Sequence, residues 1–225
     1  MPADTDNFIV SARNLEEYRA LFALTDDDLA RRILDCPGGA ASFTAEVTAQ
    51  GGDVTAADPV YELPAAELHA LAAEQAARAS GFAVSHGDQY DWSWYGTAER
   101  HAQIRRDAAA AFVADHTRHS ERYVAAQLPD LPFADDSFDL ALCSHLLFTY
   151  PQITVEQHVT YIRELTRVAA EARFFPLVTI TGSPADDLVE SVRHQLERDG
   201  VRTHLADVAF RFQKHATQML VAKGS

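Results

Sequence analysis

Two short apolar segments, separated by a glycine turn and a helix, constrain the fold of this chain more than any other feature. Residues 31–36 predict a strand that runs into the adjacent glycines Gly38 and Gly39. A helical pattern over residues 41–50 follows, and residues 53–57 predict a second strand. Two strands joined through a helix pair in parallel, so the sequence predicts an α/β fold with a doubly wound sheet.

The rest of the chain supplies the other candidate strands. Three segments with strand-like patterns lie at residues 122–126, 138–143 and 173–181. Residues 207–212 and 217–222 predict a terminal antiparallel pair. With the first two strands, these segments predict a seven-stranded sheet that is mostly parallel and has an antiparallel C-terminal strand pair.

Capping and stop signals predict where the helices begin and end. Thr25 forms a capping-box pattern with the acid three residues later, and we expect residues 1–30 to form an N-terminal helical cap. An alanine-rich helix over residues 64–80 is predicted to stop at Gly81. Ser183 is the predicted N-cap of the last helix, because a proline follows it directly.

Length and composition predict a single acidic domain. No linker divides residues 1–225, and residues 82–121 form a helical and aromatic insertion that we expect near the substrate side. The 33 Asp and Glu outnumber the 19 Lys and Arg, giving a formal charge of −14. Such a surface repels nucleic acid and anionic membranes, so neither is an expected partner.

The two cysteines, Cys36 and Cys143, both lie in strand-like apolar segments. They predict buried free thiols, which suit a cytoplasmic location. The N-terminus is acidic and polar, unlike a secretory signal, and the apolar runs are too short to cross a bilayer. His116 and His119 share a helix face without a third ligand, so we expect no metal site.

The turn after the first strand is a candidate ligand site. A nucleotide-like ligand approaches the backbone closely there, and Gly38 and Gly39 leave room for it. Asp58 ends the second strand, where an acid accepts hydrogen bonds from ribose hydroxyls. The competing interpretation is an ordinary strand-to-helix turn with a capping aspartate. The pattern Gly-x-Gly-x-x-Gly of dinucleotide enzymes is absent around residue 38.

A second segment, residues 131–148, decides between nucleotide classes. It reads Leu-Pro-Phe, an acidic pair and Ser-Phe-Asp, and then enters the strand predicted at 138–143. In this respect the chain resembles the class I (Rossmann-like) S-adenosylmethionine (SAM)-dependent methyltransferases. The resemblance covers roughly residues 30–222. In the first turn, Pro37 and Ala41 stand where the family usually has the outer two of three glycines.

The resemblance implies SAM as cofactor and suggests which residues contact it. Gln127 stands where the family usually has an aspartate that accepts from the adenine amino group, and its carbonyl also accepts hydrogen bonds. The expected cofactor-binding residues are Asp35, Pro37, Gly38, Gly39, Asp58, Pro59, Gln127, Leu128, Ser144 and His145.

Candidates for chemistry and for covering the site are fewer. His145 and Tyr150 follow the fourth strand and are candidate catalytic residues, with His145 as a general base. The competing interpretation of His145 is hydrogen bonding to the backbone or stacking at the cofactor. Aromatic rings attract a sulfonium cation, and four of them are candidates for a substrate or lid role. They are Tyr18, Phe22, Trp94 and Tyr95, for which plain packing is the alternative.

Three functions fit these observations. The first is a SAM-dependent methyltransferase that acts on a small-molecule substrate, because the chain has no separate substrate domain. The second is an enzyme with the same fold that consumes SAM as its substrate. The amino nitrogen of SAM attacks the Cγ atom of the same molecule, which forms azetidine-2-carboxylate and releases methylthioadenosine. The third is a non-catalytic SAM-binding module. The sequence makes no prediction of the acceptor atom or the oligomeric state.

Overall fold

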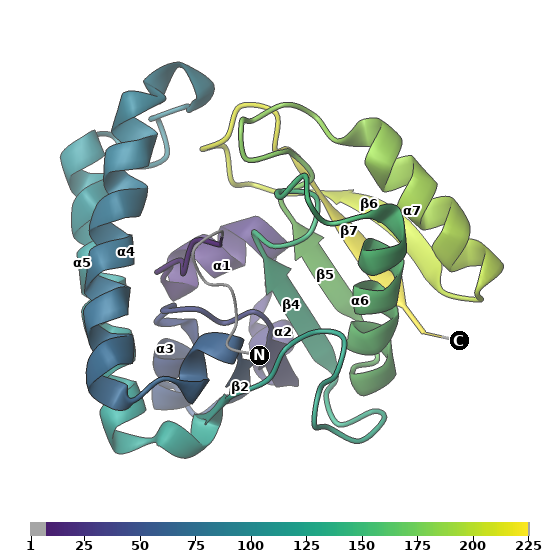
Figure 1. The fold of residues 1–225 in the computed structure, drawn as a ribbon, viewed down its shortest axis with the longest axis horizontal. Coiled ribbons are helices and arrows are strands. Elements are labelled where there is room, and N and C mark those ends of the chain that lie inside the picture. Colours follow the sequence, from purple (N-terminus) through teal and green to yellow (C-terminus); the bar gives the residue numbers. More distant parts are fainter. Residues whose placement is uncertain (1–7, 225) are drawn as a thin grey trace.

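A seven-stranded sheet runs through the part of the chain that the computed structural model describes, residues 8–224 (Figure 1). Its strand order is β3-β2-β1-β4-β5-β7-β6. Strands β1 to β5 pair in parallel, and β7 runs antiparallel to both β5 and β6. The predicted doubly wound sheet with an antiparallel C-terminal pair is therefore confirmed. The strands are β1 Arg32–Asp35, β2 Asp53–Ala57, β3 Tyr123–Val124, β4 Leu140–Ser144, β5 Ala172–Phe175, β6 Arg202–Asp207 and β7 Gln218–Lys223.

Three of the α-helices begin at capping boxes. Asn14, Thr25 and Thr154 each form a reciprocal capping box with the residue three positions on. Residues 1–7 of the expected N-terminal cap lie outside the described residues. The helices are α1 Leu15–Phe22, α2 Asp26–Leu29, α3 Phe43–Ala49, α4 Ala65–Ser85, α5 Ala98–Arg118, α6 Val155–Val168 and α7 Asp186–Arg198, with short 3-10 helices η2 Pro59–Glu62, η3 Gly87–Gln89 and η4 Ser120–Arg122.

The two faces of the sheet are buried under different helices. Along β1, Ile33 packs with α1 and α3, and its neighbour Leu34 packs with α6 and α7 on the opposite face. Strand β4 alternates in the same way, with Leu142 on the α1 side and Cys143 on the α6 side. Because successive side chains of a strand point to opposite faces, both faces need apolar residues, and the middle of each of these two strands is apolar on both sides.

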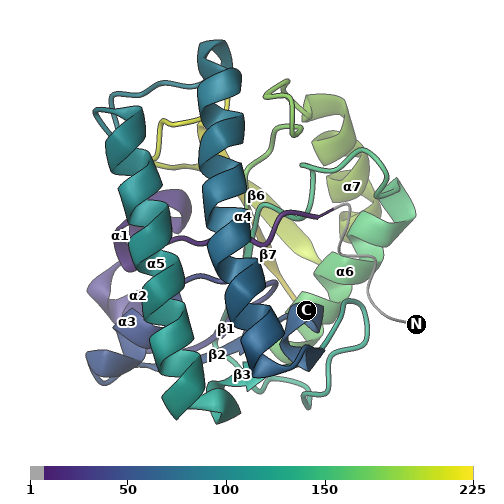
Figure 2. The same cartoon turned by 60° about the vertical axis from the view of Figure 1, so that its left-hand side comes forward.

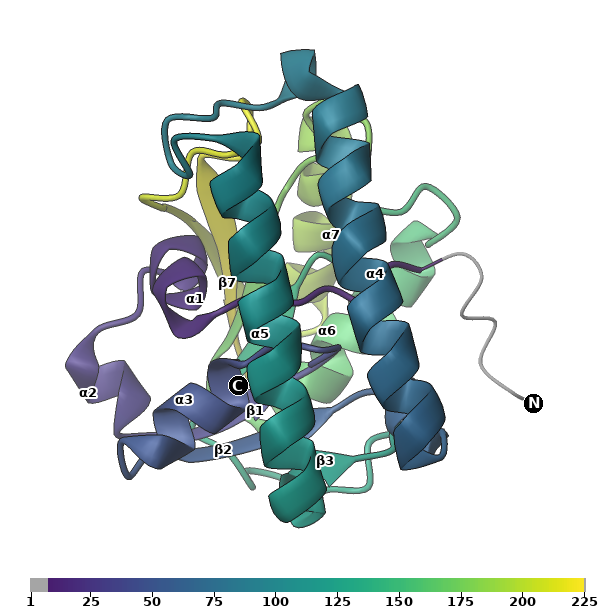
Figure 3. The same ribbon diagram turned by 90° about the vertical axis from the view of Figure 1, so that its left-hand side faces the viewer.

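Helices α4 and α5 form a long antiparallel hairpin (Figures 2 and 3). In the sequence the hairpin lies between β2 and β3, which are neighbours in the sheet. Small residues, including Ala72 of α4 and Ala108 and Ala109 of α5, pack against Phe112 in a separate apolar cluster. The hairpin stands beside the sheet edge where β2 and β3 lie, and the first described residues run between it and the sheet (Figure 3). This arrangement places residues 8–13, which we call the N-terminal strip, near the carboxyl ends of the strands.

Several predicted boundaries were wrong because tertiary packing overrides local signals. Helix α4 continues through Gly81 to Ser85, since Ala83 is buried in the core. Strand β5 ends at Phe175 instead of running to residue 181. Helix α7 has Ala185 as its N-cap in place of the predicted Ser183. Element ends are the least secure part of any such prediction.

The first strand of the C-terminal pair was misplaced for the same reason. Strand β6 spans Arg202–Asp207, ahead of the predicted residues 207–212. The apolar alternation in that segment belongs to Phe210 and Phe212, which fill the core under the α4–α5 connection. The pattern correctly indicated burial but not a strand.

A buried ion pair ties α1 to α5. Glu17 is 1% exposed and Arg105 is 3% exposed. The Arg105 Nη1 atom donates to Glu17 Oε2 at 2.8 Å, and its Nη2 atom donates to Glu17 Oε1 and, at 2.7 Å, to the Tyr95 hydroxyl. The Tyr95 hydroxyl also donates to Glu17. Burial of these charges is tolerated only because each is hydrogen-bonded to its partner.

We predict that Glu17→Gln lowers the free energy of unfolding by about 3–5 kcal/mol, because it leaves the Arg105 charge buried without a counter-ion. Asp26→Asn is the matched control, since Asp26 pairs with Arg19 at the surface, where its side chain is 92% exposed. That change is expected to cost less than about 1 kcal/mol. Urea denaturation of both variants measures the difference, and equal losses would contradict the assignment.

Candidate ligand-binding site

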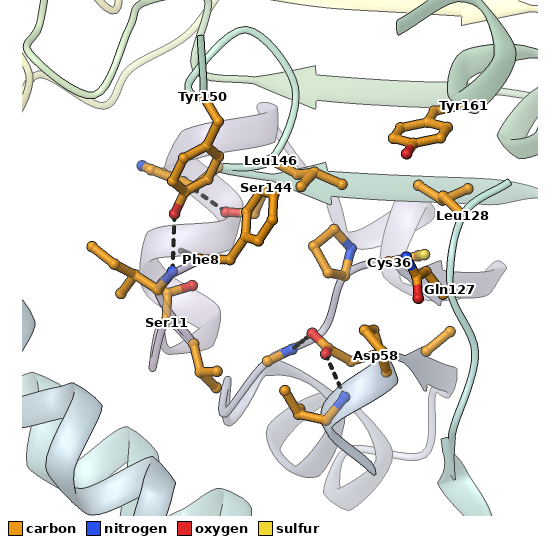
Figure 4. A pocket seen from close by; sticks show the side chains of 18 of the residues that line it. Phe8, Ser11, Cys36, Asp58, Gln127, Leu128, Ser144, Leu146, Tyr150 and Tyr161 are labelled. Atoms are coloured by element: carbon orange, nitrogen blue, oxygen red, sulfur yellow. Dashed lines mark hydrogen bonds between the residues drawn. The ribbon is translucent and has the colours of Figure 1, made fainter. Parts of the chain in front are cut away.

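A cavity of about 340 Å³ lies at the carboxyl ends of the parallel strands (Figure 4). In a doubly wound sheet these ends meet at one edge, which is where ligands bind. Cys36 and Pro37 reach the cavity from the end of β1, and Asp58 reaches it from the end of β2. Ser144 and His145 line it from the end of β4. Its volume falls in the range of small-molecule sites.

Asp58 is the buried acid of this cavity. Its Oδ2 accepts a hydrogen bond from the Gly39 N–H at 2.9 Å, and its Oδ1 accepts one from the Val60 N–H at 3.0 Å. Burial raises the pKa of Asp58 to about 6, although both hydrogen bonds act to lower it. Each carboxylate oxygen has two lone pairs, so each can still accept a bond from a ligand.

The two glycines of the first turn differ in what they face. Gly39 lines the cavity and has a φ of +55°, and a Cβ there would lie 3.0 Å from the carbonyl oxygen of Ser11. Gly38 is not part of the cavity lining; a Cβ on it would lie 2.7 Å from the Tyr61 hydroxyl. The turn therefore needs Gly38 for packing between the strand ends rather than for ligand approach.

Asp35 was expected to contact the cofactor, but the structure buries it beneath the turn, away from the cavity lining. The Tyr18 hydroxyl of α1 is 3.0 Å from both of its carboxylate oxygens. Burial raises the pKa of Asp35 well above its usual value. This acid holds α1 against the end of β1.

The remaining expected cofactor residues do line the cavity. Pro59 lies beside Asp58, and Gln127 and Leu128 line the same side of the cavity from the segment after β3 (Figure 4). The sequence thus brings together Pro37, Gly39, Asp58, Pro59, Gln127, Leu128, Ser144 and His145.

His145 and Tyr150 both border the cavity. The Nδ1 atom of His145 is 2.8 Å from the Ser144 hydroxyl. Burial, and then the positive charges of Arg13 and Arg105, lower the pKa of His145 well below its usual value. The imidazole is therefore neutral at neutral pH. The Tyr150 hydroxyl accepts a hydrogen bond from the Ile9 N–H at 3.0 Å, and burial raises its pKa, so it stays protonated.

None of the four aromatic residues expected to cover the site lines the cavity: Tyr18, Phe22 and Tyr95 lie in the core, and the half-buried Trp94 packs against it. Tyr18 stacks on Phe43 with ring centroids 4.3 Å apart, and Phe22 is fully buried beside it. Tyr95 is buried, and Trp94 packs edge-on against Phe210. Helix α1 and the α4–α5 connection have their own apolar faces to bury, and these rings do so.

Two groups of lining residues were missed from the sequence. Residues 8–11 form one wall, held by backbone bonds from Ala40 N–H to Ser11 oxygen and from Ser42 N–H to Arg13 oxygen. The second group, around the start of α6, includes Tyr161 (Figure 4). The N-terminal strip has no periodicity that would indicate a binding role. For α6, the approach to the cavity depends on the angle at which the helix packs.

Residues 8–224 hold neither a metal-binding cluster nor a membrane-spanning helix. No cluster of three or more His, Cys, Asp or Glu side chains in that range is arranged to hold a metal ion. No helix there is both long and apolar enough to span a membrane.

Part of the chain is similar to known methyltransferases. A family model described as "Methyltransferase domain" matches residues 96–173, which include the Leu-Pro-Phe segment and β4. This match agrees with the resemblance of the sequence to class I SAM-dependent methyltransferases. SAM is the cofactor that this resemblance implies, and the cavity suits it: a buried carboxylate with free lone pairs faces apolar walls that have room for a nucleoside.

Individual relatives are distant. An uncharacterised protein of Methanocaldococcus jannaschii is 28% identical over 199 residues, covering 84% of this chain and 88% of its own. A SAM-dependent methyltransferase structure from Methanosarcina mazei aligns with 13% identity and a TM-score of 0.44, covering 86% of this chain and 92% of that one. A SAM-dependent methyltransferase from Aquifex aeolicus aligns with 13% identity and a TM-score of 0.43, covering 93% and 95% of the two chains.

We predict that Gly39→Ala lowers the free energy of unfolding by about 1–3 kcal/mol, because alanine resists a positive φ and its Cβ meets backbone. Gly81→Ala is the control. It lies inside α4 with no atom within 4 Å of the new Cβ, so it is expected to stabilise the protein by about 0.5–1 kcal/mol. Urea denaturation compares them, and a Gly39→Ala protein as stable as wild type would refute the strained turn.

Proposed function

We propose that this protein transfers the methyl group of SAM to a small-molecule acceptor in the cavity that Asp58 borders. The observation that carries the proposal is the position of Asp58: a buried carboxylate at the end of β2, inside a cavity of nucleoside size. In this proposal the ribose hydroxyls donate to Asp58. The adenine lies toward Gln127 and Leu128, and the methionine end lies toward Ser144 and His145.

Methyl transfer needs little chemistry from the protein. The acceptor attacks the activated methyl in line, and the sulfur leaves as a neutral thioether. The main contribution of the chain is to hold both partners in attack geometry and to exclude water. His145 sits at the cavity edge with a neutral ring, and because burial and the nearby arginines lower its pKa well below the usual value, the imidazole is a weak base. Its role in this proposal is therefore hydrogen bonding to the acceptor or the cofactor.

One observation favours transfer over cyclisation of SAM. A cyclising enzyme needs a closed pocket without space for a second molecule. Here a second cavity of about 100 Å³ adjoins the first at His145 and Tyr150. That space suits a small acceptor.

We predict that the purified protein, incubated with SAM alone, leaves the cofactor intact. Chromatography of the mixture over time separates SAM, S-adenosylhomocysteine and methylthioadenosine. Time-dependent methylthioadenosine above a protein-free blank would support cyclisation and overturn the transfer proposal. Calorimetry with S-adenosylhomocysteine on the same sample tests the cofactor assignment: no binding would overturn it.

We predict that Asp58→Asn weakens S-adenosylhomocysteine binding at pH 8 by about 10- to 100-fold, the loss expected for a charge-assisted hydrogen-bond partner. Wild-type affinity should fall as the pH drops through about 6, because protonated Asp58 loses acceptor capacity toward the ribose. The variant should lack this pH dependence, since an amide does not titrate there.

Asp53→Asn is the matched control for this measurement. Asp53 begins the same strand at the end away from the cavity and is exposed. Its replacement changes the net charge equally and is expected to leave affinity and pH dependence unchanged. Calorimetry at several pH values provides both readouts. Wild-type affinity in Asp58→Asn would show that the ribose binds elsewhere.

A further inference from the structure

The second cavity is walled by polar and apolar groups from four parts of the chain. Arg13 reaches it from the N-terminal strip, Phe82 from α4, and Arg105 from α5. Phe212 closes it from the segment between β6 and β7. It shares Ile9, Ser11, His145 and Tyr150 with the larger cavity. A molecule in the second cavity would therefore meet one in the first at His145.

Positive charge is in excess around this cavity. The Arg105 guanidinium donates hydrogen bonds to Glu17, to the Tyr95 hydroxyl and to the Ala12 carbonyl oxygen. Arg13 is different: within residues 8–224, its Nε and Nη1 atoms are buried and find no hydrogen-bond partner. Two guanidinium groups thus share one carboxylate. Buried polar atoms without a hydrogen-bond partner are costly, so the native protein gains when an anion that accepts from Arg13 enters the cavity.

The neighbouring groups do not supply that anion. His101 lies on the cavity wall, and burial lowers its pKa to about 3, so it is neutral. His145 is neutral for the same reason. Gln213 has a buried side-chain oxygen without a partner in the described chain, but an amide carries no charge. The site therefore lacks the negative charge that Arg13 needs.

The rest of the wall is apolar. Phe82, Tyr90, Ile180 and Phe212 line the same space, and Tyr90 stacks on Phe212 with centroids 4.4 Å apart. An arginine fork beside aromatic rings recognises a planar carboxylate attached to an apolar body. Inorganic anions would leave these rings without contacts.

We propose that the second cavity binds the methyl acceptor, and that the acceptor is a small carboxylic acid whose carboxylate pairs with Arg13 while its apolar part lies among Phe82, Tyr90 and Phe212. This inference rests on the proposed function. It makes Arg13 a determinant of substrate choice. The methionine carboxylate of SAM is a second possible source of the same chemistry, and the test separates the two.

The first arm of the test uses the protein saturated with S-adenosylhomocysteine. Benzoate and phenylacetate are titrated against benzamide and phenylacetamide, and binding is followed by thermal shift and by NMR. We expect the two acids to bind in the second cavity and the two amides not to bind, because only the acids carry a carboxylate that pairs with Arg13. Arg13→Met should weaken acid binding by about tenfold or more, and Arg13→Lys by less, since lysine keeps the charge but not the fork. Arg106→Met, at an exposed arginine of α5, should change nothing.

The second arm identifies the source of the carboxylate. Affinities for S-adenosylhomocysteine and methylthioadenosine, which lacks the amino-acid part, are measured in wild type and Arg13→Met. The proposal expects both affinities to be unchanged by the substitution. A selective loss for S-adenosylhomocysteine would assign Arg13 to the cofactor and overturn the acceptor assignment.

Other results also decide the question. Equal binding of acids and amides, absence of acid binding to wild type, or full acid binding by Arg13→Met would each overturn the inference while S-adenosylhomocysteine still binds. Failure of S-adenosylhomocysteine to bind wild type would instead overturn the proposed function. The melting temperature of each variant without ligand shows that it is folded.

Discussion

The Asp58 carboxylate holds together the two turns on which the site depends. One oxygen accepts from the turn after β1, and the other accepts from the first turn of η2, after β2. Adjacent parallel strands end side by side, so a single short acid at the end of one strand reaches both. The cost is burial of a charge, which is visible in its raised pKa. The hydrogen bonds that offset that cost also aim the carboxylate into the cavity.

The N-terminal strip adds the second constraint. Backbone bonds from Ala40 and Ser42 hold residues 11–13 against the first turn, so Ser11 lies where the two cavities meet and Arg13 lines the second cavity. Helix α1 follows at once and is fixed by Glu17 to Arg105 of α5. The hairpin α4–α5 is thereby locked to the sheet. The same buried ionic groups, Glu17, Arg105 and Arg13, therefore have three effects. They fix the position of the N-terminal strip, set the charge of the second cavity and contribute to the stability of the fold.

The sequence predicted the sheet well because its signals were local and repeated. Capping boxes at Thr25 and Thr154, and the apolar strands β1 and β4, act within a few residues. Signals failed where distant packing decided the outcome. Gly81 did not stop α4, and the alternation through Phe210 and Phe212 reflected burial beneath the hairpin instead of a strand.

The residues of the ligand site were also predictable where they follow strand ends, and not where distant packing brings them together. Asp58, Gln127, Ser144 and His145 each follow or adjoin a strand end, so topology alone brings them to one edge. Asp35 matched a sequence pattern, but Tyr18 covers it. The second cavity was out of reach, since Arg13, Arg105 and Gln213 come from three separate segments with no shared motif. Their meeting depends on how the hairpin and the N-terminal strip pack.

A crystal structure of the protein with S-adenosylhomocysteine tests the central claim most directly. The account predicts electron density for a ribose with both hydroxyls within hydrogen-bond distance of the Asp58 carboxylate, and for a purine against Gln127 and Leu128. Density for the nucleoside at any other place, or a cavity that remains empty at saturating ligand, would contradict it.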